Sequence, residues 1–251
     1  EGLPKLTREA LEELQLTRLN ETLARLKARG GFYKDYPEKL DALSDLQKLP
    51  FTTAQMLSEY PGKFLITSQS EVSRVISGAT SGTTGPAKRV FYTANDTEHT
   101  VGFFTAGISE MLSPGEKCLI AFPFTGPSGL GDLIAQAVER LGAIPVKAGF
   151  GRAWGELSAL VRETRPETYI GFPVTLLSLS RMYGVDLPIK RALVSGDACP
   201  GGVMEELKTI LGSKIYPHYG SRECGLGGAV TCQAFEGMHL RENHIIPEII
   251  D

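Results

Sequence analysis

The sequence has few cysteines, no long apolar run and no excess of basic residues. Four cysteines in 251 residues are typical of a reducing compartment, so we predict a cytoplasmic location. No apolar stretch approaches the roughly 20 residues of a membrane-spanning helix, and no basic-then-apolar leader is found. The net charge of −3, with scattered basic residues, argues against a nucleic-acid surface. We therefore expect neither nucleic acid nor a membrane among its partners.

What is present is an ordinary globular composition, 42% hydrophobic and 22% charged. Leucines at helical spacing predict a first helix over residues 8–29, with Thr7 as N-cap and Gly30 as its end. A second helix is predicted to begin at Thr52, because Thr52 and Gln55 have capping-box spacing, and Pro61-Gly62 ends it.

From residue 116 onward, short apolar runs alternate with amphipathic segments of helical length. The runs are "KCLIAF", "AIPVKA", "TYIGF", "RALVSG" and "KIYPHYG". This rhythm predicts an α/β fold with a mainly parallel sheet and flanking helices, followed by a short β-rich C-terminal segment. We expect a helical region over 1–75, an α/β core over 76–226 and the β-rich segment over 227–251.

The stretch "ISGATSGTTGPAKRVFYT", residues 76–93, combines glycines, hydroxyl side chains and Lys88. It matches neither G-x-x-x-x-G-K-[ST] nor G-x-G-x-x-G, the usual nucleotide loops. Its spacing alone indicates a generic anion-binding loop, in which backbone N–H groups and hydroxyls surround a phosphate and Lys88 neutralises it. An ordinary glycine-rich turn is the alternative.

Several motifs in order resemble one family. "TSGTTGPAK" is similar to the signature [ST]-S-G-[ST]-T-G-x-P-K of the adenylate-forming superfamily, with the proline and its neighbour exchanged at Pro86-Ala87. "FYTAND" and "SGDACP" resemble the phenylacetate–CoA ligase branch of that superfamily. "YGSRECG" stands where the superfamily has Y-G-x-T-E, and "GMHLRENHIIPEIID" resembles the stretch closing this part of the ligase fold. The resemblance runs from about residue 35 to the last residue. It implies the N-terminal part of a ligase whose C-terminal domain follows Asp251.

The resemblance implies a reaction in which a carboxylic acid and MgATP give an acyl-adenylate and pyrophosphate, after which coenzyme A takes the acyl group. Catalytic roles fall to Lys88, Arg222 and Glu223, with Glu223 also holding Mg²⁺. Arg222 departs from the family, which usually has a threonine there. The nucleotide-binding residues implied are Ser81, Gly82, Thr83, Thr84 and Gly85 in the phosphate loop and Gly196, Asp197, Tyr219, Gly220 and Ser221 elsewhere.

The acid is expected to lie at the strand ends. The candidate pocket residues are Phe124, Gly171, Phe172 and Pro173, each of which is equally compatible with plain core. The branch suggests an aryl or arylacetic acid. Three alternatives stay open: transfer of the acyl group to a carrier protein, a non-catalytic nucleotide- or metal-binding module, and a homodimer rather than a monomer.

A zinc site is a separate hypothesis. Cys224, Cys232, His239 and His244 are separated by eight, seven and five residues, and two thiolates with two imidazoles suit tetrahedral Zn²⁺. A site with four protein ligands has no open position, so we expect this zinc to be structural. Two buried cysteines and two unrelated histidines are the alternative.

Overall fold

The computed structural model describes residues 7–78, 88–126, 129–212 and 214–249. Packing divides the chain into two units, one formed by residues 1–94 with 241–251 and the other by residues 95–240. The segment boundaries expected after residues 75 and 226 stay a prediction, because the units follow packing in space rather than order along the chain.

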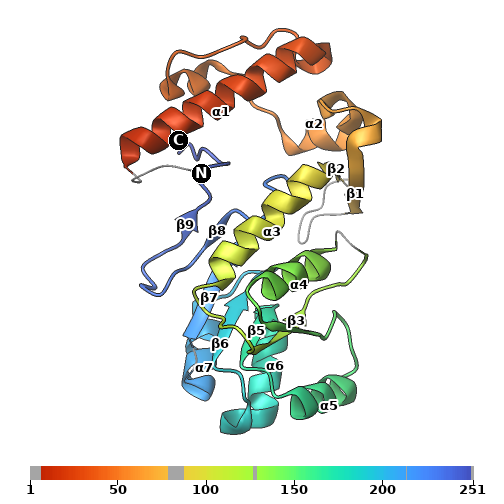
Figure 1. Cartoon of the computed structure of the whole chain (residues 1–251), viewed down its shortest axis with the longest axis vertical. Helices are drawn as coiled ribbons and strands as arrows, with labels where there is room; N and C mark the ends of the chain where they lie inside the picture. Colours follow the sequence, from red (N-terminus) through yellow and green to blue (C-terminus); the bar gives the residue numbers. More distant parts are fainter. Residues whose placement is uncertain (1–6, 79–87, 127–128, 213, 250–251) are drawn as a thin grey trace. The chain divides into compact units, whose positions relative to one another are not determined.

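The second unit is built on a sheet with the strand order β4-β3-β5-β6-β7-β8-β9 (Figure 1). Every pairing from β4 to β7 is parallel, and β7–β8 and β8–β9 are antiparallel. The strands are β3 (Lys117–Ala121), β4 (Ile144–Lys147), β5 (Thr168–Gly171), β6 (Arg191–Val194), β7 (Lys214–Tyr219), β8 (Ala229–Val230) and β9 (His239–Leu240). The α/β fold with a mainly parallel sheet is thereby confirmed.

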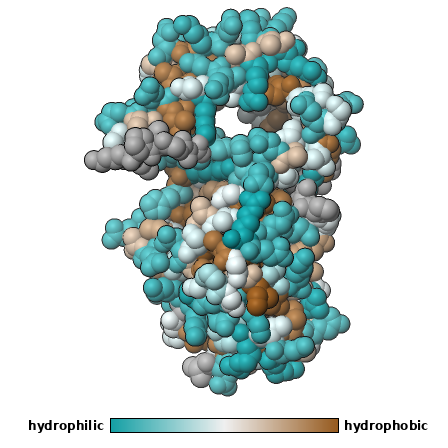
Figure 2. Space-filling view, in the orientation of Figure 1, coloured by the Kyte–Doolittle hydropathy of each residue, from teal (hydrophilic) through white to brown (hydrophobic). Residues whose placement is uncertain are grey.

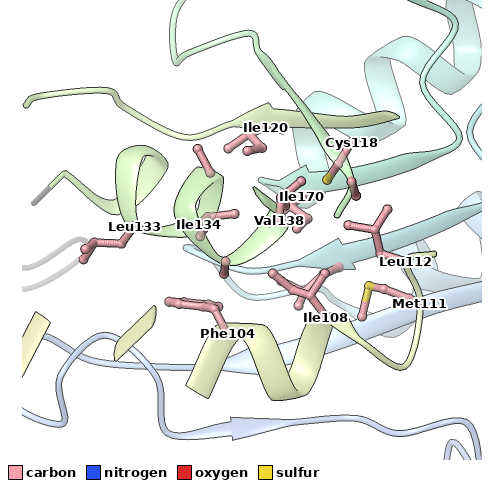
Figure 3. Packing of buried hydrophobic residues seen from close by; sticks show 14 of the residues in the cluster. Phe104, Ile108, Met111, Leu112, Cys118, Ile120, Leu133, Ile134, Val138 and Ile170 are labelled. Atoms are coloured by element: carbon pink, nitrogen blue, oxygen red, sulfur yellow. The ribbon is translucent and has the colours of Figure 1, made fainter. Parts of the chain in front are cut away.

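Helices cover both faces of this sheet. Cys118 and Ile120 of β3 face one cluster, which α3 and α4 complete with Phe104 and Ile134; Figure 3 shows these side chains pointing toward one another. Leu119 of β3 faces the opposite cluster, against α5, α6 and α7. The period of two along a strand sends successive side chains to opposite faces. The helices are α3 (Ala94–Ile108), α4 (Leu130–Arg140), α5 (Trp154–Thr164), α6 (Pro173–Tyr183) and α7 (Gly201–Leu211).

In the described part of the first unit, the α-helices are α1 (Arg8–Arg29) and α2 (Ala54–Glu59), and β1 (Val72–Gly78) pairs antiparallel with β2 (Lys88–Thr93). The predicted ends of α1 are confirmed, since Thr7 Oγ1 accepts from Ala10 N and Gly30 N donates to Leu26 O. The predicted start of α2 is wrong by one residue. Thr53, not Thr52, is the N-cap, because its hydroxyl accepts from Met56 N at 3.2 Å.

Within the described residues, no helix has both the length and the apolar character needed to cross a membrane. The face seen in Figure 2 is mostly hydrophilic, with hydrophobic residues in separate small patches. Single exposed apolar residues of this kind are normal on globular proteins.

The double-sided core predicts a sharp contrast between two isoleucines. Ile134 of α4 is 1% exposed, whereas Ile144 on the edge strand β4 is 47% exposed. We expect Ile134→Ala to lower the free energy of unfolding by about 2–4 kcal/mol through cavity formation. The matched Ile144→Ala should cost less than about 1 kcal/mol. Urea denaturation followed by circular dichroism measures both, and equal losses would contradict this assignment of the core.

Candidate functional site

The carboxyl ends of the parallel strands lie along one edge of the second unit. The chain leaves β3 toward β4 on one side and returns to β5 on the other, so β3 and β5 flank the point where the strand order reverses. Ligands of open α/β sheets bind at such a point. Two rings meet across it, Phe122 after β3 and Phe172 after β5, with centroids 5.0 Å apart.

The segment after β6 rests on this aromatic pair. Gly196 has φ +81°, and a Cβ placed there would lie 2.7 Å from a ring carbon of Phe172 and 3.0 Å from one of Phe122. The close approach therefore requires glycine. Asp197 is exposed next to it, and its Oδ1 accepts a hydrogen bond from Ala198 N at 2.8 Å. The structure thus brings together the predicted nucleotide residues Gly196 and Asp197 and the predicted acid residue Phe172.

The segment after β7 forms a closed loop. Leu226 N donates to Ser221 O at 2.8 Å, and Gly228 N donates to Tyr219 O at 2.9 Å. Thr100 of α3 anchors the loop by donating its hydroxyl to Gly225 O at 2.8 Å. Tyr219 is 57% exposed, so it is accessible from solvent.

Gly220 is the tightest point of this loop. A Cβ at this position would overlap the carbonyl oxygen of Leu226, whose own backbone is in the left-handed region at φ +68°. Glu223 is exposed in the same loop, and Arg222 is half-buried, with its carbonyl accepting from Gly225 N at 3.3 Å. The predicted residues from Tyr219 to Glu223 thus share one compact turn.

Of the predicted phosphate-binding residues, the structure describes only Lys88, which lies in the first unit. Ser81, Gly82, Thr83, Thr84 and Gly85 lie outside the described residues. Lys88 is the first residue of β2 and pairs with Gly78, the last of β1. The predicted loop therefore joins the two strands of a hairpin.

An open cleft of about 390 Å³ lies beside the ends of β3 and β4. Of the four predicted acid-pocket residues, only Phe124 lines it. Phe172 contacts the rim, since its ring centroid is 5.1 Å from that of Phe150. Gly171 and Pro173 are buried instead, and a Cβ at Gly171 would meet Tyr169 Oη at 2.5 Å.

Ser195 and His218 form a contact that the sequence did not single out. Ser195 Oγ and His218 Nδ1 are hydrogen-bonded at 2.7 Å, joining the ends of β6 and β7. The imidazole packs against Phe103 and Phe104. Its Nε2 is shielded from solvent and has no partner among the described residues. Burial lowers the pKa of His218 to about 4.

The zinc hypothesis finds no support. In the described part of the chain, no three potential metal-ligand side chains are gathered. Cys224 Sγ is instead held within its own turn by Ser221 N at 3.1 Å. His239 lies on β9, opposite Val230 of β8. The four residues proposed from their sequence spacing are therefore not gathered into a metal site in the described part of the chain.

No family model matches the chain, but individual relatives do. The phenylacetate-coenzyme A ligase of Thermus thermophilus is 30% identical over 99% of this chain and 59% of its own length. Those of Pseudomonas putida and Escherichia coli are 28% and 29% identical over 97% and 96% of the chain.

Over nearly its whole length the chain is therefore similar in sequence to phenylacetate-coenzyme A ligases. It spans about three-fifths of the length of the relatives that it matches. Among solved structures, 2-hydroxyisobutyryl-CoA ligase superposes with a TM-score of 0.81 at 17% identity, covering 93% of this chain and 59% of that one. The o-succinylbenzoate coenzyme A synthetase of Bacillus subtilis superposes at 0.51 over 66% of this chain and 33% of its own. At such identities these likenesses show the fold.

The close packing of the turn after β7 predicts that Gly220→Ala is strongly destabilising. The added methyl group overlaps backbone, which cannot rotate away, so we expect a loss of about 2–3 kcal/mol in the free energy of unfolding. Gly102→Ala is the matched control, because nothing lies within 4 Å of a Cβ on this exposed α3 residue. Alanine there should stabilise by about 0.5–1 kcal/mol. Thermal denaturation of both variants measures the difference, and a neutral Gly220→Ala would refute the close contact.

His218 predicts a pH-dependent stability. The folded pKa lies near 4, below the ordinary 6.5, so the unfolded chain binds a proton that the folded chain excludes. This stabilisation is complete above pH 6.5 and is lost as the pH falls toward 4, by up to about 3 kcal/mol.

Urea denaturation across this pH range tests the assignment. His218→Gln should flatten the dependence, whereas His239→Gln on the exposed strand β9 should retain it. Parallel profiles for the wild type and His218→Gln would show that another group is responsible.

Proposed function

We propose that the chain is the nucleotide-binding part of an ATP-dependent acid–coenzyme A ligase. The observation that carries this proposal is the match of nearly the whole chain to phenylacetate-coenzyme A ligases at 27–30% identity. The arrangement of the second unit supports it, because the Ser-Gly-Asp and Tyr-Gly segments both lie at the carboxyl edge where ligands of such sheets bind.

In the proposed reaction, a carboxylate oxygen of the acid attacks the α-phosphorus of ATP. The bond to the leaving pyrophosphate breaks, which gives an acyl-adenylate. The thiolate of coenzyme A then attacks the acyl carbon, and AMP leaves. The protein's task is mainly to position the reactants and to neutralise charge.

We assign the residues of this chain as follows. Tyr219, whose ring is open to solvent, would lie against the adenine, with Gly196 and Asp197 beside it. Lys88, together with the loop from Ser81 to Gly85, would neutralise the leaving phosphates. Arg222 precedes Glu223 in the same turn and would contact a phosphate in place of the family's threonine.

These residues fit Mg²⁺ only if the substrate phosphates and waters supply most of its ligands. Glu223 is exposed and offers the oxygen ligands that Mg²⁺ prefers. No cluster of three acidic or other metal-binding side chains occurs among the described residues. One carboxylate with substrate phosphates and waters is the usual way in which proteins hold this ion. When bound, Mg²⁺ would offset the negative charge of the leaving group.

The acid in this proposal is an aryl or arylacetic acid, the acceptor is coenzyme A and the location is the cytoplasm. Phe124 and Phe150, both lining the cleft, supply aromatic walls for such a ring.

One observation favours a second candidate, a non-catalytic nucleotide-binding module. Arg222 replaces the hydroxyl-bearing threonine of the family, and a guanidinium is not an isostere of a hydroxyl. Such a module would bind ATP without exchanging pyrophosphate.

The test uses the full-length protein that carries this chain. With phenylacetate, ATP and Mg²⁺, we expect incorporation of labelled pyrophosphate into ATP that depends on the acid. Glu223→Gln should reduce the rate about 100-fold, because the carboxylate proposed to hold the phosphate-bound Mg²⁺ is lost. Glu236→Gln, on an exposed residue outside the turn, is the matched control and should be silent.

ATP binding without exchange for any aryl or arylacetic acid would favour the module instead. Equal rates for Glu223→Gln and Glu236→Gln would remove Glu223 from the mechanism.

A further inference from the structure

The cleft beside β3 and β4 carries two positive charges that the proposed chemistry does not use. Its described lining consists of Pro123, Phe124, Lys147, Ala148, Gly149, Phe150 and Arg152. Both charged side chains in this set are basic; Lys147 is the last residue of β4, the edge strand of the parallel sheet, and Arg152 lies in the segment after it. Their companions are two phenylalanines, so the cleft offers aromatic walls and positive charge together.

Lys147 is available to a ligand. Its side chain is exposed, and its Nζ lies 5.5 Å from the centroid of the Phe124 ring. This cation–π contact places the ammonium group over an aromatic wall of the cleft rather than away from it. Lys147 has no carboxylate partner among the ion pairs of the described residues.

Arg152 is held in place by the backbone. Its Nε donates to Ala148 O at 2.7 Å, and its NH1 lies 3.8 Å from Glu156 Oε2. The Glu156 side chain is 68% exposed, so this loose pair neutralises the guanidinium only weakly. Arg152 thus supplies a second, pre-positioned charge at the cleft.

The cleft adjoins the proposed nucleotide site through a short chain of rings. Phe150 of the cleft contacts Phe172 at 5.1 Å, and Phe172 packs directly under Gly196. An acid whose reacting carboxylate is at the Ser-Gly-Asp segment would therefore point its other end into the cleft. The reacting carboxylate must stay at the nucleotide, so Lys147 and Arg152 are left to meet a different anionic group.

We propose that this cleft selects an aromatic acid that carries a second anionic group, such as a benzene ring with two carboxylates. The inference rests on the proposed function for the direction of the reacting end. The binding chemistry itself needs only the cleft: aromatic walls for the ring and two cations for the anion.

The first test measures binding to this chain without ATP. Titration calorimetry compares terephthalate with benzoate and with glutarate, which lack the second charge and the ring respectively. We expect terephthalate to bind most tightly. Lys147→Gln should weaken it about three- to fivefold, as expected for one partly exposed ion pair. Lys147→Glu should weaken it further.

Lys214→Gln is the matched control, because Lys214 is an exposed lysine at the amino end of β7 and outside the cleft. It should leave terephthalate binding unchanged. Thermal denaturation of each variant checks that the fold is retained.

Three results would overturn the inference. They are no detectable terephthalate binding, equal binding of benzoate and terephthalate, and tighter binding of adenosine 3′,5′-bisphosphate, which would assign the cations to a nucleotide phosphate. The proposed function is tested separately. If the full-length protein activates phenylacetate as well as 4-carboxyphenylacetate and Lys147→Gln changes neither, the acid selection fails while the ligase activity stands.

Discussion

Burial of the parallel strands on both faces is the constraint on which the site depends. Cys118 and Ile120 must face α3 and α4, and Leu119 must face α5 to α7, so the strand can neither slip by one residue nor turn over without exposing its apolar side chains. Because β3, β5, β6 and β7 run parallel, their carboxyl ends lie at one edge. The loops that carry Phe122, Phe172, Gly196 and Tyr219 are brought together by this packing alone.

Close backbone packing then sets the positions of those loops. Gly196 lies on the rings of Phe172 and Phe122, and Gly220 lies against the carbonyl of Leu226. Neither position has room for a side chain. The Ser195–His218 hydrogen bond joins the ends of β6 and β7, the strands that precede these two glycines. Tyr219 and Asp197 are exposed at the surface of a loop pair whose backbone is tightly held, which is the arrangement that a pre-formed ligand site requires.

The parts predictable from the sequence are those governed by local pattern. The buried runs such as "KCLIAF" identified the strands, and the cap residues Thr7 and Gly30 identified the ends of α1. Helix α3 was missed, although Val101, Phe104 and Ile108 have helical spacing and all are buried. The polar start of this helix, "ANDTEHT", obscured the pattern.

Other features depend on contacts that a single sequence does not display. The spacing of Cys224, Cys232 and His239 indicated zinc, yet each residue is committed locally, to a turn, a loop or a strand pair. Lys147, Phe150 and Arg152 were overlooked because the end of β4 and the loop after it contain no recognisable motif. Only the structure places them around a cleft with Phe124.

The tightly packed loops and the exposed cleft residues differ in how much substitution they tolerate. A substitution at Gly196 or Gly220 disturbs the backbone of the loops after β6 and β7, whereas Lys147 and Phe150 are exposed on an edge strand and its loop. Surface substitutions of the latter kind usually change stability by less than about 0.5 kcal/mol. The charge and width of the cleft can therefore change with little effect on the fold or on the loops proposed to hold the nucleotide. Because Phe172 separates the two regions, the proposed nucleotide site is compatible with clefts of different charge and width.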